Sequence, residues 1–238
     1  MSSRLPETEL ANWAFLPPAQ KRANLERHEQ PKVIVGSYEP FRKVFPDAVN
    51  QQFPLFSDAL AATDWNALEA RLVQECGGNE DKIRMNRRVL AATHKYADEQ
   101  RIAARGVDVL PLGFGGGIKY GFGLNLLIRY PTHSAIVFCD LRSSNRLADR
   151  AMRFVFSALH HRFREAYSDL AGAELEIWRY GTKTNRELTA VRFSGDPFDW
   201  QAMVEDVRET HHIWDSVRKG GDDRKRAAGG GPGPLFGR

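Results

Sequence analysis

The sequence contains no long apolar run and only two cysteines. Its mean hydropathy is −0.47, and no stretch offers the roughly 20 apolar residues that a membrane-spanning helix needs. Its first residues show no apolar segment behind a basic start, so no secretory signal is expected. Cys76 and Cys139 stand far apart and supply neither a disulfide framework nor a zinc-ligand set. We therefore expect a protein of the reducing cytoplasm that makes no contact with membranes.

The sequence also lacks the motifs of several enzyme classes. It has no Gly-Lys-Ser/Thr element, and its glycine-rich segment precedes a strand where a dinucleotide-binding motif requires a helix. Ser157 and Cys139 lie within a predicted helix and a predicted strand, without the sharp turn of a nucleophile elbow. Adjacent histidines on predicted helices point about 100° apart, and His133 stands alone. We expect no cofactor and no metal bound through histidines.

The periodicity of the apolar residues predicts both strands and helices. Residues 107–193 favour strands, because apolar residues alternate or fill short runs between glycines and prolines. Helical periodicity is found at 80–103, 145–170 and 199–217. The sequence therefore predicts an α+β protein with a mixed, mainly antiparallel sheet of about five strands, flanked by helices.

Composition divides the chain into three parts. Residues 1–79 carry scattered prolines between short amphipathic segments, which predicts a helical or irregular N-terminal region. Residues 80–219 form the predicted α+β core domain. Residues 220–238 are rich in glycine and charge, which predicts a disordered C-terminal tail.

Positive charge is concentrated in two segments of this chain, whose formal net charge is +4. Arg87 and Arg88 belong to the first basic cluster, and Arg142 and Arg146 begin the second. Such clusters suit a polyanion because they displace its counterions, although solvated helix faces are also often basic. Our main hypothesis is a non-catalytic protein that binds nucleic acid through its phosphate backbone.

A glycine-rich segment, residues 113–123, supports the same hypothesis. Two Gly-Phe-Gly units flank Lys119 and lead into a strand. In this respect the segment resembles the glycine-rich loop of the RAMP superfamily of CRISPR RNA-binding proteins, which implies contact with an RNA backbone. The candidate phosphate-contacting residues are Gly115, Gly117, Lys119 and Gly121. The alternative is a glycine-rich hairpin or bulge that needs positive φ.

Three carboxylates motivate a second hypothesis, a metal-dependent nuclease. Asp140 ends an apolar strand, while Glu174 and Glu176 share one face of a later strand. Such nucleases use two or three carboxylates to hold Mg²⁺ and activate water. The order of elements over 80–180 is similar to the restriction-endonuclease-like fold, although Arg142 stands where that family has a lysine. The alternative is that Asp140 pairs with Arg142 or a helix N-terminus and that both glutamates face solvent.

A third hypothesis is an adaptor protein that recruits a protein partner. Residues 52–56, Gln-Phe-Pro-Leu-Phe, resemble the Gln-x-x-Leu-Phe peptide with which bacterial replication and repair proteins dock on the sliding clamp. Leu235 and Phe236 in the tail match only its last two positions. Such peptides bind in an extended form and place apolar side chains in a groove. The candidate partner-binding residues are Gln52, Leu55, Phe56, Leu235 and Phe236; the alternative for 52–56 is an apolar loop packed on the core.

Overall fold

The structure is a computed structural model that describes residues 5–29, 37–52, 62–182 and 186–229. Its α-helices are α1 (Glu7–Trp13), α2 (Pro18–Glu29), α3 (Glu39–Ala48), α4 (Trp65–Glu75), α5 (Glu80–Glu99), α6 (Asp149–Leu159) and α7 (Trp200–Gly229). A π-helix, η1 (His160–Arg164), and a 3₁₀-helix, η2 (Ser168–Leu170), follow α6. The strands are β1 (Gln51–Gln52), β2 (Ala103–Gly106), β3 (Leu112–Gly115), β4 (Ile118–Tyr120), β5 (Leu126–Arg129), β6 (Ser134–Asp140), β7 (Glu174–Tyr180) and β8 (Leu188–Arg192).

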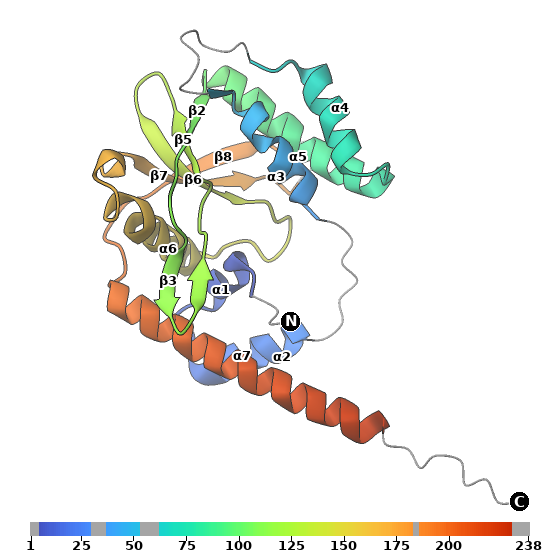
Figure 1. Ribbon diagram of the computed structural model, residues 1–238, viewed down its shortest axis with the longest axis vertical. Helices are drawn as coiled ribbons and strands as arrows, with labels where there is room; N and C mark the ends of the chain where they lie inside the picture. Colours follow the sequence, from blue (N-terminus) through green and yellow to red (C-terminus); the bar gives the residue numbers. More distant parts are fainter. Residues whose placement is uncertain (1–4, 30–36, 53–61, 183–185, 230–238) are drawn as a thin grey trace, which may run out of the picture.

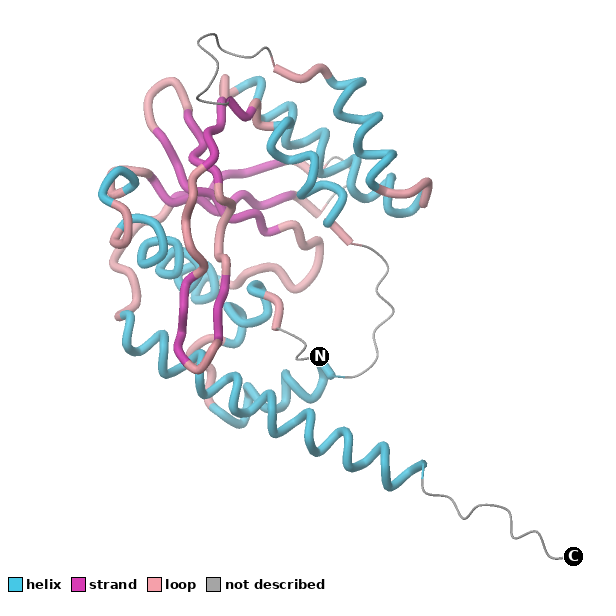
Figure 2. The backbone as a smooth tube through the Cα atoms, in the orientation of Figure 1, coloured by secondary structure: helices cyan, strands magenta, loops and turns pink. Residues whose placement is uncertain are grey.

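Six of these strands form one mixed sheet in the order β1-β2-β5-β6-β7-β8, and β3 and β4 form a separate hairpin (Figures 1 and 2). The pairs β1–β2 and β6–β7 are parallel, and the other neighbours are antiparallel. The predicted α+β class and mixed sheet are thus confirmed. The prediction placed the sheet within residues 107–193, but β1 and β2 precede this range, and β3 and β4 within it form the separate hairpin. The two glutamines of β1 carry no apolar periodicity that would predict this strand.

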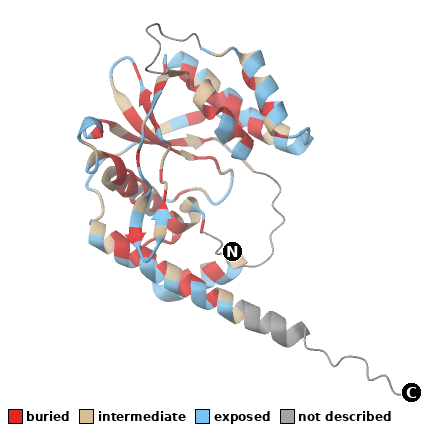
Figure 3. Cartoon of the chain, in the orientation of Figure 1, coloured by how far each residue is buried: buried red, intermediate tan, exposed pale blue. Residues whose placement is uncertain are grey.

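Helices cover both faces of the sheet, so the buried residues lie between layers (Figure 3). On one face, α3, α4 and α5 pack over strand residues such as Val137 and Trp178. On the other face, α6, α1 and the first part of α7 pack over Ile136 and Ile177. A smaller apolar cluster joins α1, α2 and α7 through residues such as Leu25 and Trp214. Both faces of the central strands are therefore buried, which explains their nearly continuous apolar sequence.

Local capping sets several helix starts. The side chain of Asn79 accepts a hydrogen bond from the N–H of Lys82 and begins α5, and Asp64 begins α4 in the same way. Three boundaries differ from the prediction. The helix expected over 80–103 ends at Glu99, and strand β2 begins at Ala103. The helix expected over 145–170 is a shorter α6 that continues as η1, and α7 extends to Gly229, into the expected tail. No helix among the described residues is both long and apolar enough to cross a membrane.

Candidate functional site

The three carboxylates of the nuclease hypothesis do not converge. In the parallel β6–β7 pair, Val137 lies beside Glu176 and Asp140 lies beside Arg179. Since neighbouring residues of a strand point to opposite faces, Asp140 faces α6, whereas Glu174 and Glu176 face the α5 side. Asp140 accepts a hydrogen bond from the N–H of Leu147, just before α6, at 3.1 Å. The structure therefore contradicts a metal site shared by Asp140 and the two glutamates.

Asp140 has a structural environment that was only partly expected. Its Oδ2 lies 3.9 Å from the Nε of Arg179, and its side chain is wholly buried. Arg142 contacts Glu9 at 3.2 Å and donates to the carbonyl of Asn145, so it does not pair with Asp140. The alternative expectation was right about the start of the helix and wrong about Arg142. A buried carboxylate needs such donors because desolvation otherwise disfavours its charge.

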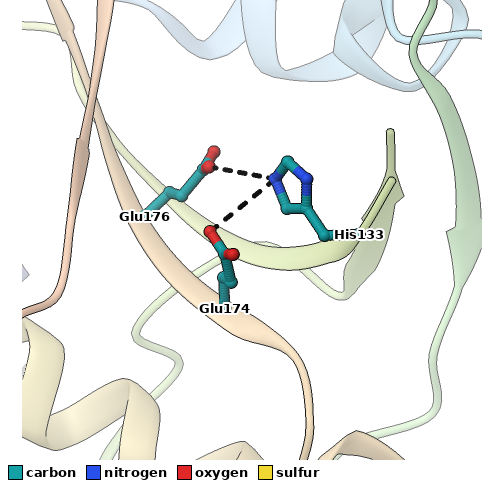
Figure 4. Close-up of side chains that lie close together, drawn as sticks. All are labelled: His133, Glu174 and Glu176. Atoms are coloured by element: carbon teal, nitrogen blue, oxygen red, sulfur yellow. Dashed lines mark ion pairs between the residues drawn. The ribbon is translucent and has the colours of Figure 1, made fainter. Parts of the chain in front are cut away.

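Glu174 and Glu176 instead meet His133, which lies in the turn between β5 and β6 (Figure 4). The His133 Nε2 atom lies 3.7 Å from an oxygen of each glutamate. Arg192 of β8 approaches the same oxygens, with its Nε at 3.1 Å from Glu174 and 3.3 Å from Glu176. Glu176 is 0% exposed, so the expectation that both glutamates face solvent is wrong for this residue. We call these four side chains the His133 cluster.

Aromatic side chains fix the orientation of the Glu176 carboxylate. Its Oε2 accepts hydrogen bonds from the Tyr130 hydroxyl at 2.7 Å and from the Trp178 indole N–H at 2.9 Å. Burial, and then the charge of Glu176, raise the pKa of Tyr130 far above its usual value, so that its hydroxyl remains a donor. The Tyr130 ring also stacks on His133 with centroids 4.2 Å apart. Glu176 is thus held rigidly, with its second oxygen directed at His133.

The spacing of residues along the chain did not predict a role for His133, because this histidine has no other ligand-type residue nearby in sequence. A strand, a helix and another strand in succession favour a parallel pair, and the β6–β7 register then places Glu174 beside Ala135, two residues after His133. That register was the only available signal. It depends on long-range pairing, which residue spacing along the chain does not show.

The glycine-rich segment forms the hairpin of β3 and β4, which packs against α7 (Figure 1). Gly115, Gly116 and Gly117 all have positive φ, and the pairing shifts register between Gly113 and Gly115. Arg208 of α7 donates to the carbonyl of Phe114 at 2.9 Å, and a Cβ on Gly115 would collide with its guanidinium. These glycines therefore serve the hairpin and its close contact with α7. Lys119 is exposed.

Several of the basic side chains have partners within the protein. Arg87 contacts Glu69 at 2.6 Å, across α4 and α5, while Arg88 is exposed. Partial burial, and then the charge of Arg179, lower the pKa of Arg146. Arg162, in the second basic cluster, is buried and donates to the carbonyls of Leu110, Val109 and Phe122 and to Asn125. Part of the apparent excess of positive charge thus fastens loops and helices together.

The proposed clamp-type peptide begins at the edge of the sheet. Gln52 ends β1, where it pairs with Arg105, and its amide donates to Asn50 Oδ1 at 2.6 Å. Leu55, Phe56, Leu235 and Phe236 lie outside the described residues. A cleft of about 270 Å³ is lined by Asn50 before this segment and by Ala62 and Thr63 after it. Asn50 and Ala62, which lie on either side of residues 52–56 in the sequence, therefore line the same cleft.

Comparison with known proteins shows the family. The model of a family described as "Sliding clamp-binding bacterial toxin SocB" matches residues 8–225, and the chain belongs to this family. The chain is also similar to the DNA replication inhibitor toxin SocB of Caulobacter vibrioides (strain NA1000 / CB15N). The two are 29% identical over 233 residues, which cover 96% of this chain and 95% of the relative. No solved structure gives a significant match.

This family membership corrects the main functional hypothesis. A family defined by binding to a clamp protein points to a protein partner, so the predictions of a nucleic-acid-binding protein and of a nuclease are wrong. The protein-partner alternative is the one that agrees with the family. The basic composition favoured a polyanion partner because net charge does not show which charges are already paired within the fold.

Proposed function

We propose that this chain binds a bacterial sliding clamp through residues 52–56 and thereby inhibits DNA replication. The family description and the relative's name support both the partner and the effect. The observation that carries the proposal is the match of Gln52, Leu55 and Phe56 to a clamp-docking peptide, in a chain that belongs to a clamp-binding family.

The position of Gln52 is consistent with such a role. It lies on the outermost strand of the sheet, and β1 is only two residues long. An extended peptide that continues from a sheet edge can enter an apolar groove of a partner. Replication and repair proteins that dock with the same kind of peptide would compete for that groove, which is the proposed cause of inhibition.

Binding of the full chain to purified clamp, measured by isothermal titration calorimetry, tests the proposal. We expect Gln52→Ala, Leu55→Ala and Phe56→Ala each to weaken binding at least tenfold, since an anchor side chain of an interface typically contributes about 2 kcal/mol or more. Gln51→Ala is the matched control, because Gln51 is the neighbouring glutamine on β1, and it should bind like the parent chain. The parent chain and Gln51→Ala should displace a labelled Gln-x-x-Leu-Phe peptide from the clamp. The three anchor variants should not.

The tail provides the competing location. Deletion of residues 230–238 removes Leu235 and Phe236, and we expect clamp binding to be unchanged. Loss of binding on this deletion, with normal binding by the three anchor variants, would transfer the site to the tail and overturn the assignment to residues 52–56. Circular dichroism of every variant shows that each remains folded.

A further inference from the structure

The His133 cluster has a geometry that the proposed clamp binding does not use. The ligand atoms of His133, Glu174 and Glu176 all lie within 4.8 Å of one another, and no other such group occurs within the described ranges (Figure 4). They come from the β5–β6 turn and from β7, on the α5 side of the sheet. Two carboxylates and one imidazole are a common ligand set for a divalent transition metal.

The two glutamate oxygens that approach His133 lack hydrogen-bond donors. Glu174 Oε2 and Glu176 Oε1 are buried atoms with no hydrogen-bond partner, and Glu176 is completely inaccessible to solvent. A buried carboxylate oxygen that no donor satisfies costs free energy. Arg192 forms ion pairs with both oxygens without donating a hydrogen bond to either, and a bound metal ion would satisfy both at once.

Hydrogen bonding also leaves the appropriate nitrogen of His133 unprotonated. Its Nε2 lies 3.2 Å from an Nη of Arg192, and its Nδ1 lies 3.1 Å from the Thr132 hydroxyl. A guanidinium only donates, so Nε2 must accept and Nδ1 must carry the proton. The Nε2 lone pair therefore accepts from Arg192 and becomes available to a metal ion when Arg192 moves away, in the tautomer that a metal ligand needs.

Arg192 is the cation that now occupies this corner. Its side chain is 57% exposed, on the outermost strand β8. Its Nε is near both carboxylates without making a hydrogen bond to either of the two oxygens that face His133. The exposed side chain of Arg192 can move into solvent when a metal ion replaces its charge beside the buried Glu176 carboxylate.

We propose that His133, Glu174 and Glu176 bind one divalent transition-metal ion, with Arg192 displaced toward solvent. Ligands on a tetrahedral ion at roughly 2.0–2.2 Å lie roughly 3.4 Å apart. The two histidine–glutamate separations of 3.7 Å need to close only slightly, and the two glutamate oxygens lie within 4.8 Å of each other. Tyr130 and Trp178 orient Glu176, and Thr132 orients His133, which supplies the outer hydrogen bonds of a metal site. The ion would join the β5–β6 turn to β7 and stabilise the fold.

The test uses the full chain without a histidine tag, treated with EDTA and then titrated with Zn²⁺, Mn²⁺ or Mg²⁺. We expect one Zn²⁺ per chain by calorimetry, weaker Mn²⁺ binding, and little Mg²⁺ binding because Mg²⁺ prefers oxygen ligands and water. Zn²⁺ at about one hundred times its dissociation constant should raise the Tm by roughly 5–10 °C, since it binds only the folded state. Co²⁺ should give visible absorption bands of a low-symmetry site.

Variants separate a metal site from a simple ion-pair network. His133→Asn and Glu174→Gln should abolish Zn²⁺ binding, whereas Arg192→Met should strengthen it several-fold by removing the competing cation. Glu165→Gln is the matched control, because Glu165 also contacts two histidines, His160 and His161, without forming a three-ligand group. Its Zn²⁺ binding should equal that of the parent chain.

Two results would overturn the metal assignment. One is the absence of Zn²⁺ binding by both the parent chain and Arg192→Met. The other is Zn²⁺ binding that persists in each of the two single variants, His133→Asn and Glu174→Gln. Both readouts are independent of the clamp, so a failure here leaves the clamp-binding proposal intact, and the reverse also holds.

Discussion

Lys21 offers the sharpest test of how this protein is held together. It lies on α2 with 0% of its side chain exposed, and its ammonium group contacts Asp206 and Glu209 of α7, each at 2.6 Å. Asp206 also accepts a hydrogen bond from the N–H of Phe15 at 2.9 Å. Lys21→Met would keep the apolar stem and remove the charge that faces a nearly buried carboxylate.

The expected cost follows from the burial of the pair. The removal of one partner from a buried ion pair costs about 3–5 kcal/mol, because the other charge stays desolvated and unpaired. For a chain of this size each kcal/mol lowers the Tm by about 2–4 °C, so the Tm of Lys21→Met should fall by about 6–20 °C. Lys43 contacts Glu75 at 2.8 Å but is 51% exposed, and Lys43→Met should leave the Tm almost unchanged because solvent screens such a pair.

The effect should also depend on pH. Burial raises the pKa of Asp206 above its ordinary value of 3.8, while Lys21 and the Phe15 N–H act in the opposite direction. Without Lys21 the pKa of Asp206 rises further, so the folded variant binds a proton more readily than the unfolded chain. The cost of Lys21→Met is therefore smallest below pH 3.8, where Asp206 is protonated in both states, and reaches its full size above the raised pKa.

Urea unfolding of the parent chain, Lys21→Met, Lys43→Met and the double variant Lys21→Met/Asp206→Leu measures these differences. The double variant should recover part of the loss, because no unpaired charge stays buried, although the Phe15 N–H loses its acceptor. The reasoning is refuted if Lys21→Met and Lys43→Met lose similar stability at pH 7, or if the loss for Lys21→Met is the same at pH 3 and pH 7.

Two further predictions concern backbone strain and thiol reactivity. Gly123 has φ of 84° and an added Cβ would lie 2.6 Å from Leu159, so Gly123→Ala should destabilise by about 2–4 kcal/mol in thermal unfolding; Gly113→Ala, whose Cβ would meet nothing within 4 Å, is the control, and equal losses would contradict the argument. Burial raises the pKa of Cys139 to about 12, so almost none of this thiol is ionised at pH 8. A disulfide reagent should therefore react rapidly with both cysteines in urea but only slowly with Cys139 in the native protein. Rapid reaction of Cys139 in the native protein would contradict this prediction.

The candidate sites show where residue patterns were informative. Glu174 and Glu176 were expected on one face of a strand, and they lie there because side chains alternate along any strand. Residue spacing could not show whether Asp140 shares a site with these glutamates. The β6–β7 register shows that it lies on the opposite face of the sheet. The histidine that contacts the glutamates, His133, lies in the turn between β5 and β6, whereas the glutamates lie on β7. Period and spacing describe a single element, whereas a site usually combines several.

The basic clusters failed for a related reason. Arg87 and Arg162 look alike in sequence, as cations on helices, and both suggested an exposed surface for a polyanion. In the folded chain Arg87 contacts Glu69, and Arg162 donates to four acceptors around Val109 and Phe122. A charge contributes to an external field only where it remains exposed and uncompensated. The protein-partner hypothesis agrees with the family, and the peptide at residues 52–56 stays a prediction.

The sequence alone determined the local structure of this protein: the α+β class, the caps at Asp64 and Asn79, and the positive φ at Gly115 to Gly117. These features depend on interactions between residues a few positions apart, so they can be read along the chain. The tertiary structure decided which charges are buried and with what partners. Lys21 meets Asp206 across 185 positions, and β1 joins the sheet only through its pairing with β2. Such contacts form when apolar faces pack together and desolvate the polar groups between them, a process that local periodicity does not specify.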